Sequence, residues 1–442
     1  MNRPIVQWSR ALALLFGTSL SIAGAAQAQL TLGDAVGAAL AAHPSVSAAA
    51  ARVDAADGAS DAARAARLPG VAIDAGLTRF QEPMIVAPFH SLDFTDPPTF
   101  DRTLLQGRIA MAYTLFDGGE RSARINGADA AYEATRFGRS ATEMSVIEET
   151  ATAYVNVLSA QAVLDAASAQ VRALEEEADR AQRRFDAGTS AELDVLRARA
   201  TLQEATAQLA SAEARVSLSV RSLARLMGVD GASISSDALS DVTATSSSSP
   251  TGISQSPVVL QADRAAHAAE ARVSQERAGR LPTVQAGAGL LDFGTLDGGH
   301  IAEWQAGLQV SWPLFTGGAR SAAVRRAQAE LTAARSDLDV ARLQVAQAVD
   351  VAETSVVEAD ARAEALEVAV VQWEEVARIE ALALQAGSGV QGDLLRAQAG
   401  LFQARAGNAR ARYDAVLSRI RLARAQGTLD RSWIDEALEA SQ

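Results

Sequence analysis

Two stretches of the chain alternate apolar and polar side chains with a period of two. The first stretch covers about 70–80 and 102–115, and the second covers about 283–293 and 301–312. Each of these four segments is about ten residues long, apolar on one side and polar or small on the other. Such alternation is typical of β-strands whose two faces meet different surroundings. We therefore expect two pairs of strands.

The two faces of these strands favour lipid on one side and water on the other. The apolar side carries large side chains, namely Val71, Ile73, Leu77, Leu105, Ile109, Met111, Tyr113, Leu115, Trp304, Leu308, Val310 and Trp312. Arg108, Glu303, Gln305 and Gln309 lie on the opposite side. A half-buried sheet in a soluble domain would alternate in the same way, but this length and pattern are typical of membrane barrel strands.

A long helix is expected after each strand pair. No proline occurs over 119–186 or over 318–385. At about 1.5 Å per residue each stretch predicts a helix of about 100 Å. Apolar residues step by four and three along both, as in Ala160, Leu164, Ala167, Val171, Leu174, Ala178, Ala181 and Phe185, and in Leu331, Ala334, Leu338, Ala341, Val345, Ala348 and Ala352. This period predicts coiled-coil packing, and the many alanines predict close neighbours.

Gly188 and Gly387 end these helices, because glycine readily takes the left-handed conformation that closes a helix. Return helices are expected over 190–227 and 389–425, so each long helix becomes one arm of a hairpin. Two pairs have the spacing of a capping box, namely Thr189 with Glu192 and Ser388 with Gln391. The first return helix also carries two adjoining stripes, Leu202, Leu209, Val216 and Leu223 beside Leu193, Leu196 and Ala200. Two stripes predict a neighbour on each side, as in a cylinder of helices.

The strand exits, long helices and tips recur at one constant offset, so the chain contains one architectural unit twice. The first repeat spans 29–229 and the second 257–426. A connector rich in serine and threonine, 230–256, joins them and is expected to have little core of its own. The tail, 427–442, is expected to hold a short helix with Trp433, Ile434 and Leu438. The first repeat is the longer one, and we assign its extra residues to a loop around Glu82–Phe100.

Residues 1–28 have the organisation of a secretory signal peptide. Arg3 and Arg10 form a basic start, an apolar stretch follows, and Ala26-Gln27-Ala28 supplies an A-x-A cleavage site. The rest of the sequence has no apolar run of the length, about 18 residues, that would predict a membrane-spanning helix. We therefore expect export, with any contact to a membrane made by strands.

Composition excludes several classes of function. The chain has no cysteine, and all 40 of its basic residues are arginine, which rules out disulfides, a lysine phosphate loop and Schiff-base chemistry. A net charge of −13 argues against a nucleic-acid partner. The four histidines lack neighbours at metal-ligand spacing, and no nucleophile–base set repeats. We expect no enzymatic activity, no cofactor and no metal.

Taken together, the duplicated features resemble the TolC family of outer-membrane efflux and secretion channels. The resemblance rests on the proline-bounded segments before the strands, the Leu-Phe-x-Gly-Gly exits at 115–119 and 314–318, the long helices and the tips at 184–194 and 384–395. It implies a mainly α fold with a small β part. Because four strands cannot close a barrel in lipid, it also implies a homotrimer with a 12-stranded β-barrel and a 12-helix α-barrel.

The resemblance also implies where function resides. Arg108, Glu303, Gln305 and Gln309 would line the upper lumen. The hairpin tips would dock a periplasmic adaptor through Gly188, Thr189, Ser190, Gly387 and Ser388. The periplasmic entrance would include Asp194, Asp393 and Arg396. Asp393 holds the family's first acidic position, but Arg396 stands at the second and Gly389 at a basic gate position. Asp194 and Asp393 could equally be solvated carboxylates in a first helical turn.

The function that follows is a passive duct across periplasm and outer membrane, in contact with outer-membrane lipid. It would serve an adaptor (a membrane fusion protein) and an inner-membrane transporter of the RND or ABC class, in efflux or type I secretion. Two alternatives are a membrane-fusion-type adaptor, which would need one hairpin and a lipoyl-like module, and a structural coiled-coil envelope protein, which leaves the strands unexplained. Neither the cargo nor the transporter class follows from the sequence.

Overall fold

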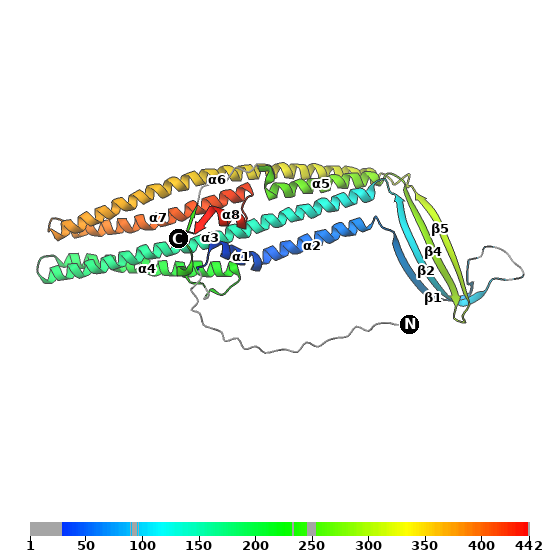
Figure 1. The fold of residues 1–442 in the computed structure, drawn as a ribbon, viewed down its shortest axis with the longest axis horizontal. Helices are drawn as coiled ribbons and strands as arrows, with labels where there is room; N and C mark the ends of the chain where they lie inside the picture. The colour runs from blue at the N-terminus through cyan, green and yellow to red at the C-terminus, as the bar shows by residue number, and fades with distance from the viewer. Residues whose placement is uncertain are drawn as a thin grey trace, which may run out of the picture.

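The computed structural model describes residues 29–88, 90, 95, 97–231, 234–244 and 253–440. The expected signal peptide, 1–28, and part of the connector lie outside these residues. The molecule is elongated, with a β-sheet at one end and two helical hairpin tips at the other (Figure 1).

The sheet contains four antiparallel strands in the order β1-β2-β4-β5. Their bounds are β1 Gly70–Ile85, β2 Phe100–Phe116, β4 Thr283–Thr295 and β5 His300–Ser311. β1 continues beyond its expected end near residue 80, since its pairing with β2 resumes at Met84 after a register shift that follows Arg79. The loop expected from Glu82 therefore starts later, because a bulge lets the strand continue.

Two helices of 67 residues each, α3 (Glu120–Asp186) and α6 (Ala319–Gln385), run from the sheet to the hairpin tips (Figure 1). Each begins directly after a glycine in the left-handed conformation, Gly119 at φ 91° and Gly318 at φ 86°. The return helices α4 (Glu192–Met227) and α7 (Gln391–Gln426) have 36 residues each and cover only the half nearest the tips.

Shorter helices fill the half nearest the sheet. They are α2 (Pro44–Ala65), which follows α1 (Leu32–Ala42), and α5 (Pro257–Ala278). Helix α3 packs against α2 and α5 in this half and against α4 and α7 in the other, and α6 packs against α5 and α7. The helices thus form four lines side by side, which we call staves, in the order α2/α4, α3, α5/α7, α6 (Figure 1).

The largest core of the described residues lies midway along the staves. Leu223 and Ile420 from the return helices belong to it together with the fully buried Tyr154 of α3. The Tyr154 hydroxyl lies 2.7 Å from the carbonyl oxygen of Leu30 and 2.8 Å from that of Ser240 and can donate to either. Burial raises the pKa of Tyr154, so the hydroxyl stays protonated.

The connector and the tail contribute side chains to this common core. Strand β3 (Val242–Ala244) of the connector pairs with β6 (Leu438–Ala440) of the tail. Helix α8 (Arg431–Ala437) contains Trp433 and Ile434, but Leu438 belongs to β6 and not to the expected short helix. Several of their side chains are buried in the common core, namely Leu239, Val242, Leu429, Ile434 and Leu438.

Across the residues that the structure describes, none of the helices is long and apolar enough to cross a membrane.

Candidate functional site

The two hairpin tips have the same backbone geometry. At the first tip Gly188, at φ 71°, donates its N–H to Phe185 O at 2.8 Å, and Thr189 N–H donates to Arg184 O at 2.9 Å. At the second, Gly387 takes φ 78° and Ser388 N–H donates to Ala383 O at 3.0 Å. These bonds form a Schellman motif, in which a left-handed residue, usually glycine, satisfies the last carbonyls of the helix.

The capping boxes predicted at the tips are wrong. The residues that precede the return helices are Ala191 and Val390, and neither helix receives a side-chain cap. The hydroxyl of Thr189 donates to Arg184 O at 2.9 Å, and that of Ser388 to Ala383 O at 3.2 Å. Both hydroxyls thus complete the end of the preceding long helix instead of starting the next one.

Gly389 sits where a side chain would collide with the backbone of α6. A Cβ atom built there would lie 2.6 Å from Leu384 N and 2.9 Å from Ala383 C. The Gly389 N–H donates to Ala383 O at 2.9 Å, which brings the two segments together. A basic side chain therefore cannot occupy this position without a change in the turn.

Asp393 and Arg396 form an ion pair within the first turn and a half of α7, and Arg396 Nε also donates to Gly392 O at 3.3 Å. Asp194, the counterpart of Asp393 on α4, is half-buried and has no cationic partner among the described residues. The hydroxyl oxygen of Ser190 is shielded from solvent without a hydrogen-bond partner in the described chain. The two tips thus share a backbone but differ in their charge.

A buried carboxylate joins the two hairpins, and the sequence reasoning missed it. Glu177 of α3 is only 1% exposed, and it accepts hydrogen bonds from Arg180 Nε at 2.8 Å, Arg184 Nη2 at 2.9 Å and Gln391 Nε2 at 2.8 Å. Arg184 Nη2 also donates to Gln391 Oε1 at 2.6 Å. Since Gln391 starts α7, this network ties the first hairpin to the second. Its sequence signal, three charged residues spaced three and four apart, is common on solvated helices.

The polar face of the sheet carries the residues expected to line a lumen. Asp74, Arg108, Leu291 and Glu303 are register partners in one row across the four strands. Arg108 Nη2 lies 3.1 Å from Asp74 Oδ2, and His90 Nε2 of the β1–β2 connection lies 3.1 Å from Glu303 Oε1. The charged side chains of this row therefore have partners on the polar face.

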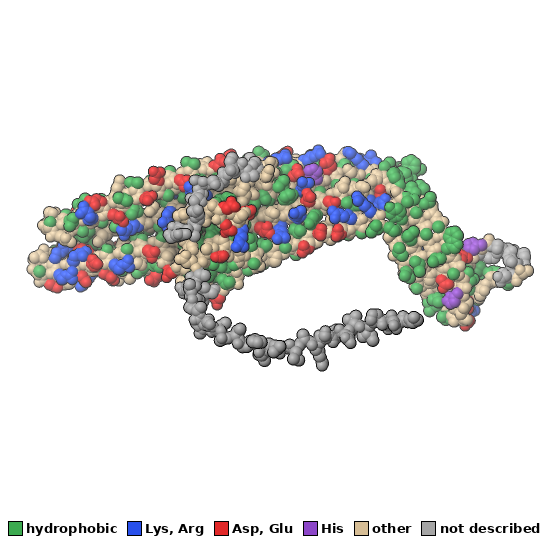
Figure 2. Space-filling view, viewed as in Figure 1, with side chains coloured by type: hydrophobic (Ala, Val, Ile, Leu, Met, Phe, Trp, Pro, Cys, Tyr) green, Lys and Arg blue, Asp and Glu red, His purple; other side chains and the backbone are tan. Residues whose placement is uncertain are grey.

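Gln305 and Gln309 lie on that same face, two and six residues after Glu303. Small residues are next to Gln305, since it pairs with Gly289 and Gly289 pairs with Ala110. On the other face, apolar side chains are exposed from all four strands, among them Ile73 at 77% and Trp304 at 78%. Figure 2 shows hydrophobic side chains gathered over the sheet, whereas charged residues cover the staves.

At the exit of the first strand pair, Asp117 accepts hydrogen bonds from Arg121 Nε at 2.6 Å and from the N–H groups of Gly119 and Arg121. Burial acts to raise the pKa of Asp117, but these bonds outweigh it and hold the pKa below its usual value. Thr316 takes the equivalent place in the second exit, so this anchor occurs in one repeat only.

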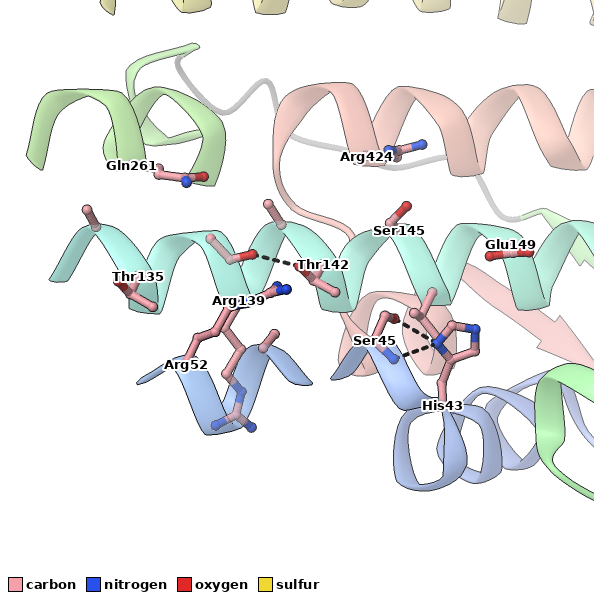
Figure 3. Close-up of a pocket in the computed structure, with 15 residues that line it drawn as sticks. His43, Ser45, Arg52, Thr135, Arg139, Thr142, Ser145, Glu149, Gln261 and Arg424 are labelled. Carbon is pink, nitrogen blue, oxygen red and sulfur yellow. Dashed lines mark hydrogen bonds between the residues drawn. The ribbon is translucent and has the colours of Figure 1, made fainter. Parts of the chain in front are cut away.

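A cavity of about 800 Å³ lies where the α2/α4 and α5/α7 staves change from one helix to the next (Figure 3). His43 Nδ1 accepts the Ser45 N–H at 3.3 Å at the start of α2, and the Thr142 hydroxyl donates to Gly138 O at 2.9 Å. His43 therefore caps the start of α2, and the Thr142 hydroxyl bonds to the backbone of its own helix. No set of three or more His, Cys, Asp or Glu side chains able to hold a metal occurs within the described ranges.

The fold and both repeats define a class of protein. The model of the family described as outer membrane efflux protein matches residues 35–229 and 252–428, so each repeat is matched and the chain belongs to this family. It is an outer-membrane channel protein of the efflux and secretion type with a periplasmic extension, and it is not an enzyme. The two alternatives, an adaptor and a purely structural coiled coil, are thereby excluded.

Particular relatives agree with this assignment. The chain is 26% identical over 411 residues to the outer membrane protein TolC of Vibrio cholerae, covering 87% of this chain and 88% of that protein. It is 29% identical over 350 residues to the protein CyaE of Bordetella pertussis, covering 74% and 71%. In fold it is similar to the outer membrane protein VceC of Vibrio cholerae, with a TM-score of 0.77, 22% identity and coverage of 90% and 96%. The outer-membrane channel OprN gives a TM-score of 0.77 at 23% identity, with 90% of each chain covered.

Proposed function

We propose that three copies of the chain form a passive export duct, with a 12-stranded barrel in the outer membrane and a 12-helix tunnel in the periplasm. The sheet carries this proposal. It has one apolar face, one polar face and two open edges, β1 and β5. Open edges leave backbone groups unpaired, which lipid does not tolerate, so neighbouring sheets must close the barrel.

The row Asp74–Arg108–Leu291–Glu303, with Gln305 and Gln309, would then line the water-filled upper lumen. Because the charged side chains of this row have partners on the polar face, the lumen should not select solutes by the sign of their charge. At the other end, three Asp393–Arg396 pairs would surround the entrance. An acidic ring attracts cations, so the arginine should leave the entrance weakly selective.

The tips would bind a periplasmic adaptor that brings an inner-membrane transporter of the RND or ABC class. Gly188 and Gly387 have open space where a side chain would project, so the tip backbones are free to make contact. Opening would require the two hairpins of a chain to move apart, which strains the Glu177–Gln391 bond. Transport itself would use the energy of the partner transporter.

Migration on mild gels tests the assembly. Unheated outer-membrane fractions should contain a band at three times the mass of the chain, and heating should convert it to monomer. A monomeric, water-soluble product would overturn the proposal.

Substitution of the tip glycines tests the docking site. Gly188→Val together with Gly387→Val should abolish export while trimers persist in the membrane, because a β-branched residue does not fit the positive φ of these turns. Gly392→Val is the matched control, since this helical glycine also has open space but no positive φ. Unchanged export by the double variant would contradict the tip assignment.

A further inference from the structure

The cavity of about 800 Å³ drawn in Figure 3 lies on one side of α3. Its lining on this helix includes a line of small and polar residues that step by three and four, namely Thr135, Gly138, Thr142, Ser145 and Glu149. Ser145 comes nine residues before Tyr154, so at about 100° per residue their side chains point in opposite directions. The cavity therefore opens on the side of α3 that faces away from Tyr154.

The Tyr154 side of the staves carries the additional elements of the chain. The Tyr154 hydroxyl lies against the carbonyl groups of Leu30 and Ser240. Side chains from α1, α8, β3 and β6 share one core with Tyr154. A duct must keep its interior open, so these elements must lie on the outside of the proposed tunnel. The cavity, on the other side of α3, then opens onto the lumen.

Four polar side chains that line the cavity have no partner. They are Arg52 of α2, Ser145 and Glu149 of α3, and Gln261 of α5. None of the four makes a side-chain hydrogen bond or an ion pair within the part of the chain that the structure describes. Figure 3 shows Arg52 on one side of α3 and Gln261 on the other. Gln261 packs closely over α3, since a Cβ atom at Gly138 would lie 3.2 Å from its Nε2.

The other arginines of the cavity are already neutralised. Arg139 Nε lies 2.8 Å from Glu143 Oε1, one turn further along α3. Arg424, at the end of α7, pairs with Glu148. The cavity is thus left with one unpaired cation and one unpaired anion, both among the four side chains named above.

These two unpaired charges, Arg52 and Glu149, lie toward opposite ends of the cavity (Figure 3). The lining on α3 runs from Ala134 to Glu149, which is about 22 Å at about 1.5 Å per residue. Sites for small molecules have volumes of about 300–1,000 Å³, so the cavity has room for an elongated one. An ion of one sign would be attracted at one end and repelled at the other, whereas a zwitterion can pair at both.

We propose that this cavity is a solute site in the wall of the duct, and that it takes an elongated zwitterion. The anionic group would pair with Arg52 and the ammonium group with Glu149. Ser145 and Gln261 would supply hydrogen bonds between the two charged ends. The two charges of such a solute should be about 10 Å apart, as in an extended tripeptide. The place on the lumen rests on the proposed duct, but the binding itself does not need it.

Calorimetry with trialanine tests the pairing on the full chain in detergent. N-acetyl-trialanine lacks the cation and trialanine amide lacks the anion. The unchanged protein should bind trialanine about fivefold more tightly than either blocked peptide. Glu149→Gln should weaken trialanine about fivefold and leave N-acetyl-trialanine unaffected, and Arg52→Gln should weaken trialanine equally and leave the amide unaffected. Equal affinity for the three peptides, or no effect of either variant, would mean solvated charges only and overturn the proposal.

Matched variants remove a charge elsewhere on the same chain. Glu175→Gln on α3 and Arg67→Gln just after α2 change exposed side chains that do not line the cavity. Both should bind trialanine as the unchanged protein does. Ser145→Trp fills the cavity and should abolish binding of all three peptides. Tight binding by this variant, or a fivefold loss in either control, would place the peptide elsewhere and overturn the site.

Thiol labelling tests on which side of the wall the cavity opens, because the chain has no cysteine of its own. A bulky, water-soluble thiol reagent should lower the conductance of Ser145→Cys channels in planar bilayers. An excess of trialanine should slow this reaction. Asp237→Cys, exposed on the connector, is the control, and its labelling should leave the conductance unchanged. A fall in conductance for Asp237→Cys but not for Ser145→Cys would overturn the place on the lumen.

The outcomes separate this inference from the proposed duct. Channels that conduct but do not bind trialanine would overturn the site and leave the duct in place. Charge-dependent binding of trialanine by a chain that forms no channel would overturn the duct and keep the cavity as a site for zwitterions.

Discussion

The two hairpins have long helices of equal length but are held together differently. Buried side chains occur along most of α3, whereas α6 buries far fewer. The α3/α4 hairpin closes on apolar clusters such as Val171, Leu174 and Ala205. The α6/α7 hairpin is joined in part by ion pairs, including Glu374–Arg405 at 2.7 Å. A duplicated sequence pattern thus folds into an interior stave and an edge stave, and position in the molecule decides how much each helix buries.

The largest effect expected from this difference is on core leucines. Leu174→Ala should lower the unfolding free energy by about 2–5 kcal/mol, since the side chain is fully buried in α3. Leu343→Ala in α6, exposed in the single chain, should change monomer stability by about 0.5 kcal/mol or less. Denaturant titration of the detergent-solubilised monomer measures both. Equal losses for the two variants would mean that the hairpins do not differ.

The second-largest effect is expected from removing the charge of Glu177, which links the two hairpins. Glu177→Gln leaves Arg184 without its buried counter-charge and should cost about 2–3 kcal/mol. The tips should also separate more readily, which raises single-channel conductance in planar bilayers. Glu176→Gln is the control, because Glu176 is 73% exposed and contacts Arg180 at only 3.4 Å. Conductance that rises equally in both variants would point away from the buried network.

Close packing inside the edge hairpin can be tested at two glycines of α7. A Cβ atom at Gly400 would lie 2.6 Å from the ring of Trp373, whereas one at Gly407 would meet Leu366 at an ordinary 3.8 Å. Gly400→Ala should therefore cost about 1–2 kcal/mol, and Gly407→Ala should stabilise by up to about 1 kcal/mol, because alanine favours helix. Thermal unfolding of the two variants measures both effects. A higher unfolding temperature for Gly400→Ala than for Gly407→Ala would contradict the prediction.

The smallest effect concerns the strand exits and depends on pH. The folded pKa of Asp117 lies below its unfolded value, so its stabilisation is complete above about pH 4 and is lost as pH falls through the folded pKa. Asp117→Asn should cost about 1 kcal/mol at neutral pH, as for a lost helix cap, and less as the pH drops below about 4. Thr316→Val, at the second exit, should show no such pH dependence. Unfolding midpoints of both variants, measured from neutral pH to below about pH 4, test this difference. An equal pH dependence in the two variants would contradict the role of Asp117.

The sequence can predict what local chemistry decides. The alternation of polar and apolar residues correctly predicted that Arg108 and Trp304 lie on opposite faces of the sheet, because side chains along a strand alternate with a period of two. Glycine marked both tips, because few other residues tolerate the left-handed turn. Contacts between distant segments could not be predicted this way. Glu177 resembles any solvated helix residue until Gln391 is placed beside it, and Thr189 fits a capping box until its hydroxyl is seen to donate to the preceding helix. The β1 extension and the place of Leu438 likewise depend on partner strands.

The order of the staves has a consequence for mixed populations. One flank of each chain is α6 and the other is α4 with α2, so the two flanks are unlike. A chain damaged on a single flank could still attach through its intact flank, yet no ring containing it would close. Co-expression of such a chain with the intact one should therefore inhibit assembly, beyond the simple dilution that an inert chain would cause.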